Sequence, residues 1–106
     1  MVVVGDVRKP LLNSLAERAK GLKVGYGLDE SSQMGPLVSK KAKDRVLNYV
    51  ENASATGANL VLDGRTARVE GYERGYYLGP TIFDRVDPET PIAHEEIFGP
   101  VASVIE

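Results

Sequence analysis

The sequence predicts an α/β layered fold with a mostly parallel sheet and two main helices. Apolar residues recur at three- and four-residue spacing in two stretches, which predicts helices over residues 8–20 and about 40–55. Short β-branched runs lie before, between and after these stretches. The expected order is strand, helix, helix, strand, strand, short helix, strand. Connections that contain helices favour parallel pairing, so at least part of the sheet should be parallel.

The first elements are predicted to be a buried strand and a helix. The run Val2–Val4 is continuously apolar, which is typical of a strand covered on both faces. The helix over 8–20 should end at Gly21 in a left-handed conformation. Its apolar stripe consists of Leu11, Leu12, Leu15, Ala16 and Ala19.

The second helix is predicted to follow a glycine-containing loop over 23–38. Ser39 is a suitable N-cap, because its hydroxyl can accept a hydrogen bond from the first turn. Gly57 is a suitable residue just beyond the C-terminal end. The buried face should consist of Ala42, Val46, Tyr49, Val50 and Ala53.

The second half of the chain is predicted to hold three strands. Residues 60–62 and 81–83 form the first two, and the last begins near Pro100. Residues 65–79 are polar and contain glycines, which predicts a hairpin or an extended surface excursion. A short helical segment should run from residue 88 to about residue 94.

The composition is that of an ordinary globular domain. The chain has 106 residues, of which 42% are apolar and 26% charged, so we expect a single domain over residues 1–106. Thirteen Lys and Arg against fifteen Asp and Glu give a net charge of −2, which argues against nucleic-acid binding. No apolar stretch approaches the roughly 20 residues that span a bilayer, so no membrane association is expected. Strands at both ends predict that the chain is a segment of something larger.

Few residues suit catalysis. The chain has no cysteine, which excludes a cysteine nucleophile and a thiolate metal site, and the single histidine, His94, cannot form a histidine cluster. We therefore predict no catalytic residue and no metal site. Glu95 and Glu96 are adjacent and should point apart, so they are not a natural acid–base pair. A tyrosine cluster favours packing on the sheet or on a partner over stacking on a ligand; it consists of Tyr72, Tyr76 and Tyr77.

Several motifs resemble the aldehyde dehydrogenase superfamily. Residues 95–101, Glu-Glu-Ile-Phe-Gly-Pro-Val, resemble its E-E-x-F-G-P-V segment, and residues 75–82 resemble its G-[YF]-[YF]-x-x-P-T segment. Residues 34–38 resemble its G-P-x-[VI] turn. The opening strand, the first helix and residues 22–25 are similar to the stretch that follows the family's catalytic cysteine. Residues 31–38 are most similar to the CoA-acylating branch, the methylmalonate-semialdehyde dehydrogenases.

The resemblance implies a partial Rossmann-like lobe of the catalytic domain, downstream of the catalytic cysteine. In that family a thiolate attacks the aldehyde carbonyl, hydride passes to NAD, and water or, in this branch, CoA releases the acyl group. The implied activity is oxidation of methylmalonate semialdehyde or a similar semialdehyde, with NAD as cofactor and CoA as co-substrate. Because the thiol and the dinucleotide-binding domain are absent from this sequence, we expect the chain alone to be inactive and to hold no cofactor. The expected compartment is the cytoplasm, or the mitochondrial matrix in a eukaryote.

Two positions match cofactor contacts of that family. Glu96 matches the glutamate that hydrogen-bonds the nicotinamide ribose hydroxyls, since a carboxylate can accept from both hydroxyls of a cis-diol. Phe98 matches the aromatic residue that packs near the nicotinamide end. Arg45 sits near where some members contact the adenosine ribose, although a solvated position on the helix is the more ordinary role for such a residue.

A second interpretation is a non-enzymatic α/β module that derives from the same lobe and serves in self-association. The expected partner is the remainder of an aldehyde dehydrogenase or a second copy of the chain, in a homo-oligomer. A longer reading frame with a cysteine shortly before Val2 would favour the enzyme. Natural start and stop codons at these ends would favour the module.

Overall fold

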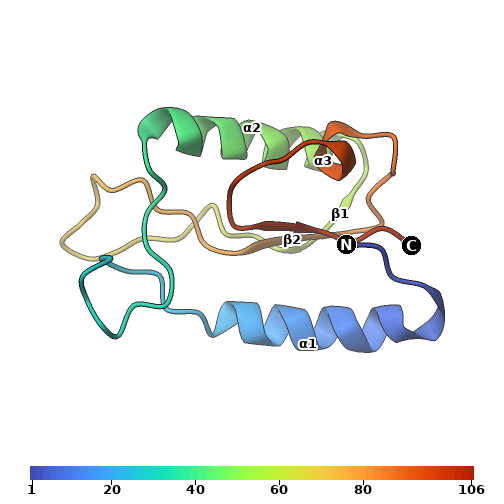
Figure 1. Ribbon diagram of the computed structural model, residues 1–106, viewed down its shortest axis with the longest axis horizontal. Helices are drawn as coiled ribbons and strands as arrows, with labels where there is room; N and C mark the ends of the chain where they lie inside the picture. The colour runs from blue at the N-terminus through green and yellow to red at the C-terminus, as the bar shows by residue number, and fades with distance from the viewer.

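The residues form three layers, with a small sheet between two helices. The computed structural model describes all of residues 1–106. Helix α1 (Arg8–Lys20) covers one face of the sheet and helix α2 (Lys40–Ala55) covers the other, as Figure 1 shows. The predicted α/β class with two main helices is therefore confirmed, and the bounds of both helices agree with the expectation.

The sheet has the order β1-β2-β3, in which β1 is Asn59–Leu62, β2 is Thr81–Asp84 and β3 is Val101–Ser103. β2 and β3 are parallel, as helix-containing connections favour. β1 and β2 are antiparallel, because the chain between them contains no helix and turns back as the predicted extended excursion. A further parallel bridge joins Val2 to Ile105 on the far side of β3.

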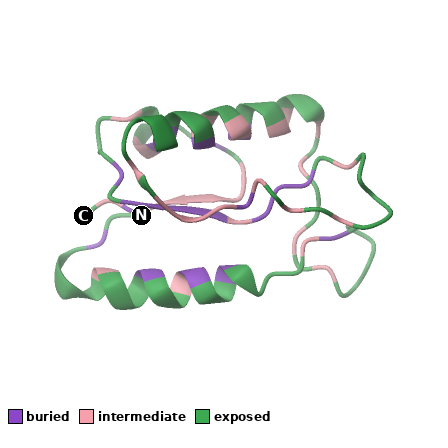
Figure 2. Ribbon diagram, turned by 180° about the vertical axis from the view of Figure 1, so that it is seen from behind, coloured by how far each residue is buried: buried purple, intermediate pink, exposed green.

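Strand β2 carries both halves of the core. All four of its residues are buried, and successive side chains point to opposite faces. Ile82 packs in the cluster beneath α1, and Phe83 packs in the cluster beneath α2. Figure 2 shows the buried residues on the sheet and on the inward faces of the two helices.

The helix termini follow the sequence signals at most positions. The Ser39 hydroxyl accepts a hydrogen bond from Ala42 N at 3.1 Å, which confirms the N-cap of α2. Gly57, just beyond that helix, has φ +89°, a conformation that glycine adopts readily. The prediction for Gly21 is wrong, because its φ of −78° is right-handed. Helix α1 ends in a turn in which Leu22 N donates to Ala19 O, and this turn needs no left-handed residue.

The amino-terminal strand is not buried on both faces, so that prediction is wrong. Val3 is 5% exposed and packs beneath α1, whereas Val2 and Val4 are 70% and 82% exposed. Alternation along an extended chain points one side chain inward and its neighbours outward, and no element of the structure covers the outer side. A short 3₁₀ turn, η1 (Gly5–Val7), then leads into α1.

The carboxyl-terminal elements are shorter than predicted. Helix α3 spans only Pro91–His94, because residues 87–90 form a turn in which Thr90 N donates to Asp87 O.

No helix in the structure combines the length and the apolar character that a membrane crossing needs.

An ion pair fixes the start of α1 against the sheet. Arg8 Nη1 lies 2.5 Å from Asp84 Oδ2, and Arg8 Nε lies 3.1 Å from a carboxylate oxygen of Glu106. The arginine and aspartate side chains are 11% and 6% exposed, so each compensates the other's buried charge. The bond to Asp84 raises the pKa of the Arg8 guanidinium.

The excursion between β1 and β2 is tied down at its base and at its tip. At the base, Gly79 N donates to Gly64 O at 2.8 Å, and Gly64 N donates to the buried Thr81 hydroxyl at 3.1 Å. Near the tip, the ring of Tyr72 stacks on Tyr26 with a centroid distance of 4.8 Å. Tyr72 thus packs on a residue of the 23–38 loop and not on the sheet. Tyr72 and Tyr76 are 45% and 40% exposed, whereas Tyr77 is buried at 4%.

The base of the excursion yields a prediction about Gly64. A Cβ atom at this position would lie 1.9 Å from the carbonyl oxygen of Gly79. We expect Gly64→Ala to lower the free energy of unfolding by about 2 kcal/mol or more, as overpacking against backbone does. Urea denaturation followed by circular dichroism measures the change. Gly27→Ala is the control, because its Cβ would meet nothing within 4 Å, and equal stability of the two variants would contradict the prediction.

Candidate functional site

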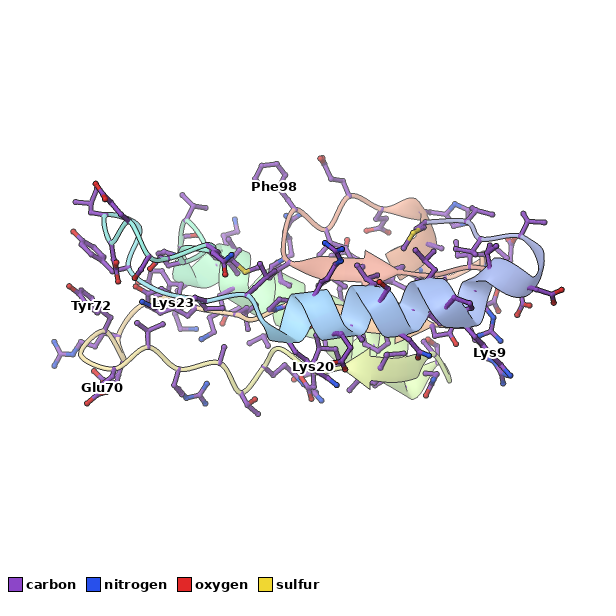
Figure 3. All side chains as sticks on the ribbon, turned by 90° about the horizontal axis from the view of Figure 1, so that it is seen from below. Lys9, Lys20, Lys23, Glu70, Tyr72 and Phe98 are labelled. Carbon is purple, nitrogen blue, oxygen red and sulfur yellow. The ribbon has the colours of Figure 1, made fainter.

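The candidate site is built on the segment that joins α3 to β3, Glu95–Pro100, which we call the α3–β3 loop. Ile97 is 8% exposed and packs in the core beneath α2. Its neighbours Glu96 and Phe98 are exposed, Phe98 to 74%. Figure 3 shows the Phe98 ring standing clear of the ribbon. The loop is thus anchored by one inward side chain and presents the two side chains beside it.

Helix α2 holds this loop along one of its sides. Arg45 Nη2 donates to Ile97 O at 2.6 Å, and Arg45 Nη1 makes a longer bond to Glu96 O at 3.4 Å. The Tyr49 hydroxyl, one turn further along α2, donates to the carboxylate of Glu95. Both donors lie on α2, about 50 residues before the loop in the sequence, so the helix fixes the path of the loop.

Close packing holds the loop on the same helix. A Cβ atom on Gly99 would lie 2.6 Å from Cγ2 of Val46, which is fully buried. Only glycine lets the backbone come this near to the helix. The glycine of the motif therefore serves as a contact point with α2.

The two adjacent glutamates have different surroundings. The bond to the Glu95 carboxylate raises the pKa of the Tyr49 phenol, burial adds to this, and the positive charge of Arg45 opposes it. The carboxylate of Glu96 makes no hydrogen bond or ion pair within the chain. Glu95 is thus engaged with α2, and Glu96 is free to accept hydrogen bonds from a ligand.

Phe98 has a φ of +53°, in the left-handed region that residues other than glycine rarely adopt. Such a conformation costs on the order of 1 kcal/mol and persists where the surroundings determine it. The burial of Ile97, the contact of Gly99 with Val46 and the bonds from Arg45 to the loop together supply that determination. The strained residue is also the one whose ring is displayed.

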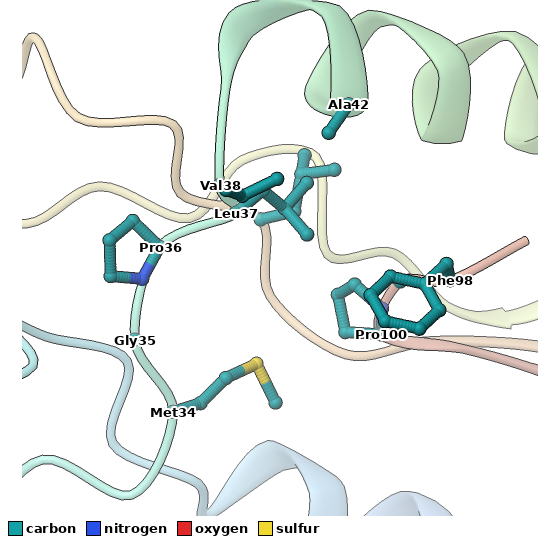
Figure 4. A pocket seen from close by; sticks show the side chains of 10 residues that line it. Met34, Gly35, Pro36, Leu37, Val38, Ala42, Phe98 and Pro100 are labelled. Carbon is teal, nitrogen blue, oxygen red and sulfur yellow. The ribbon is translucent and has the colours of Figure 1, made fainter.

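An apolar groove of about 540 Å³ lies beside Phe98. Residues 34–38 and Ala42 line one part of it, and Leu78 and residues 98–100 line the rest. Figure 4 shows Leu37 and Val38 on one side and Phe98 and Pro100 on the other. Two segments named in the sequence analysis, 34–38 and 98–100, are thus brought together across about 60 residues of chain.

A second hollow, of about 310 Å³, lies on the other side of the loop. Glu96 lines this hollow only, whereas Phe98 and Gly99 line both. The Phe98 ring therefore stands on the ridge between the two. A ligand against this ridge would meet a carboxylate, the face of an aromatic ring and an apolar wall.

The single histidine lines neither hollow. His94 is exposed at the end of α3, and no group of three His, Cys, Asp or Glu side chains is placed to hold a metal ion. The sequence reasoning missed the part that Arg45 plays, because a contact with carbonyls 51 and 52 residues away leaves no local pattern. The spacing of Arg45 and Tyr49 by four residues, which places both on one side of α2, was the available signal.

Comparison with known proteins gives a consistent result. The sequence profile described as the aldehyde dehydrogenase family matches residues 1–106. The chain is 45% identical over 105 residues to the mitochondrial methylmalonate-semialdehyde/malonate-semialdehyde dehydrogenase (acylating) of Rattus norvegicus, covering 99% of this chain and 19% of the relative. It is 44% identical over 101 residues to the betaine aldehyde dehydrogenase of Brucella anthropi, covering 95% of this chain and 21% of the relative.

A solved structure agrees with this likeness. The chain superposes with a TM-score of 0.94 and 38% identity on a protein from Sinorhizobium meliloti that is assigned as a methylmalonate-semialdehyde dehydrogenase and was crystallised with NAD. The match covers 98% of this chain and 21% of that one. The chain thus spans about a fifth of the length of the relatives it matches.

The bond between Tyr49 and Glu95 yields a prediction about titration. Glu95→Gln should lower the pKa of the Tyr49 phenol, because the hydroxyl then loses its anionic acceptor. The pKa is measured by NMR of the ring carbon that bears the hydroxyl. Glu89→Gln removes an exposed carboxylate elsewhere and should leave the pKa of Tyr49 unchanged. An unchanged pKa of Tyr49 in Glu95→Gln would show that the bond does not form in solution.

Proposed function

Because the chain belongs to the aldehyde dehydrogenase family, we propose that it forms part of the catalytic domain of an NAD-dependent aldehyde dehydrogenase. The observation that carries the proposal is the match of the family profile along residues 1–106. We propose as substrate methylmalonate semialdehyde or a similar semialdehyde, oxidised to an acyl-CoA with CoA as co-substrate. The names of the rat and S. meliloti proteins support this choice. The Brucella relative is named for a different aldehyde, so the test below compares both substrates.

The residues of the α3–β3 loop fit one end of NAD. When bound, this cofactor supplies a ring that accepts hydride. The free carboxylate of Glu96 suits the two hydroxyls of a ribose, and the exposed ring of Phe98 suits a flat heterocycle. The groove beside Phe98 is apolar and offers no cluster of cations for the phosphates. We propose that Glu96 and Phe98 bind and orient the nicotinamide ribose end of the cofactor.

The chain supplies no thiol, so the nucleophile that attacks the aldehyde must come from residues outside it. The part proposed for this chain is therefore binding and orientation, with Gly99 and Ile97 fixing the loop against α2. We propose that residues 1–106 form one domain, inactive alone. We further propose a cytoplasmic compartment, or the mitochondrial matrix in a eukaryote, in keeping with the mitochondrial relative.

The proposal predicts activity for a chimera and none for the chain alone. Residues 1–106 replace the matching segment of the rat relative, and NADH formation is followed with methylmalonate semialdehyde or betaine aldehyde in the presence of NAD and CoA. We expect turnover of the semialdehyde by the chimera and no signal from the chain above a protein-free blank. Reproducible turnover by the pure chain would contradict the proposed inactivity. A chimera that melts like its parent and yet is inactive would contradict the proposed function.

The loop residues predict weak binding of NAD. A charge-assisted hydrogen bond contributes about 1.5–3 kcal/mol, whereas a complex with a Kd of 1 mM requires about 4 kcal/mol. We therefore expect a Kd of about 1 mM or weaker, with NMR shifts confined to the neighbourhood of Glu96 and Phe98. Glu96→Gln should abolish these shifts, and Glu89→Gln should retain them. Micromolar affinity by calorimetry, or shifts clustered elsewhere, would overturn the assignment of the two residues.

We also propose that the chain self-associates through its amino-terminal segment. Val2 and Val4 are exposed, and their N–H groups make no backbone hydrogen bond, so the segment presents an apolar, unpaired strand edge. Such edges pair readily, and a symmetric dimer is the commonest result. Light scattering coupled to size exclusion should give twice 11.5 kDa at high concentration. Val4→Lys should give a mass of 11.5 kDa. Val38→Lys changes a residue that is 87% exposed beside the groove, and this variant should keep the mass of the dimer. A monomeric wild-type chain would contradict the proposal.

A further inference from the structure

We propose that Arg45 is a positioning residue, whose guanidinium holds the α3–β3 loop so that Glu96 and Phe98 face one ligand together. The part of this inference that concerns the ligand rests on the proposed function. The part that concerns the loop rests on the contacts of Arg45 alone. Arg45 itself would not touch the ligand, since both of its bonds go to the backbone of the loop.

The two acceptors of Arg45 are successive carbonyls. Nη2 bonds Ile97 O at 2.6 Å and Nη1 reaches Glu96 O at 3.4 Å, so one planar group spans two peptide units. These units lie between the Cα atoms of Glu96 and Phe98. Fixing the two planes fixes the backbone angles of Ile97, and so restricts how Glu96 and Phe98 can lie relative to each other. A guanidinium suits this task because its donors have a rigid, forked geometry.

The charge of Arg45 is not used in an ion pair. No carboxylate lies within 4.0 Å of its guanidinium, although one of its two acceptors is the backbone carbonyl of Glu96. Hydrogen bonds from a charged donor are roughly twice as strong as neutral ones. The positive charge therefore stabilises the backbone path of the loop and leaves the carboxylate of Glu96 available.

The strained conformation of Phe98 explains why the loop needs the two bonds from Arg45, which we call the clamp. With φ at +53°, this residue would relax toward the common regions if the loop were released. The buried Ile97 side chain and the contact of Gly99 with Val46 would still hold the loop against the domain. Loss of Arg45 should therefore loosen Glu96–Phe98 without unfolding the domain. Phe98→Gly should relieve the strain, because glycine adopts a positive φ without steric cost.

The experiment uses the 106-residue chain and four variants. Arg45→Ala removes the clamp, and Arg45→Lys keeps the charge without the fork. Lys41→Ala is the matched control, because it removes one positive charge from an exposed position one turn earlier on α2. The double variant Arg45→Ala with Phe98→Gly tests relief of strain. Far-ultraviolet circular dichroism and thermal melting establish that each variant is folded.

The first readout is the backbone ¹⁵N order parameter of Glu96, Ile97 and Phe98. Rigid backbone gives about 0.85 and flexible backbone less than about 0.6. We expect the higher value in the wild type and Lys41→Ala, the lower in Arg45→Ala, an intermediate value in Arg45→Lys, and recovery in the double variant. Unchanged order in Arg45→Ala, or equal loss in Lys41→Ala, would overturn the proposal.

The second readout is an NMR titration with nicotinamide riboside, which contains the ring and the ribose but no phosphate. We expect shifts at Glu96 and Phe98 in the wild type, and a loss of affinity of about tenfold in Arg45→Ala, which corresponds to one hydrogen bond from a charged group. Affinity that is unchanged while the loop is loosened would overturn the role of Arg45 in positioning. Absence of shifts in the wild type, together with a loosened loop in Arg45→Ala, would overturn the proposed function and leave the clamp standing.

Discussion

The structure depends on the complete burial of strand β2. Ile82 and Phe83 are adjacent in the chain, yet each is at the centre of a different half of the core, because a strand presents alternate side chains to opposite faces. A strand so deeply buried needs partners for its polar groups at both ends. The Thr81 hydroxyl accepts from Gly64 N, and Oδ2 of Asp84 accepts from Arg8, whereas the buried Oδ1 of Asp84 has no hydrogen-bond partner. The two ends of β2 thereby fix the excursion on one side and the start of α1 on the other.

The candidate site follows from the same packing. Phe83 shares its cluster with Val46 and Val50, which sets the position of α2 over the sheet. Val46 in turn limits how Gly99 can lie, and Arg45 and Tyr49 on the same helix bond the backbone and side chain of the α3–β3 loop. The displayed side chains are therefore positioned by contacts of the loop with α2 and the core, which Ile97 and Gly99 of the loop make possible. A rigid helix is a more precise support for a binding loop than another loop would be.

Local signals predicted much of the fold. Ser39 and the apolar spacing of α2 gave its bounds, since a cap and a stripe are properties of neighbouring residues. The exposure of Val2 and Val4, the right-handed Gly21 and the contacts of Arg45 depend on what lies across from them in space, which periodicity does not encode. The motif around Glu96 and Phe98 located the candidate site. It did not indicate that Glu95 would be occupied by Tyr49, because that partner lies 46 residues away.

The bridge between Val2 and Ile105 has a consequence for the order of folding. The amino-terminal segment cannot find its native neighbour until about 100 further residues exist, which takes roughly 5 to 20 s at ordinary rates of synthesis. Helices α1 and α2, by contrast, consist of local contacts and can form as soon as they leave the ribosome. Residues 1–4 are therefore synthesised about 100 residues before their native neighbour, and they are among the last of these 106 residues to be paired. During that interval the nascent chain exposes an apolar strand, the kind of surface that chaperones recognise and that wrong partners can capture.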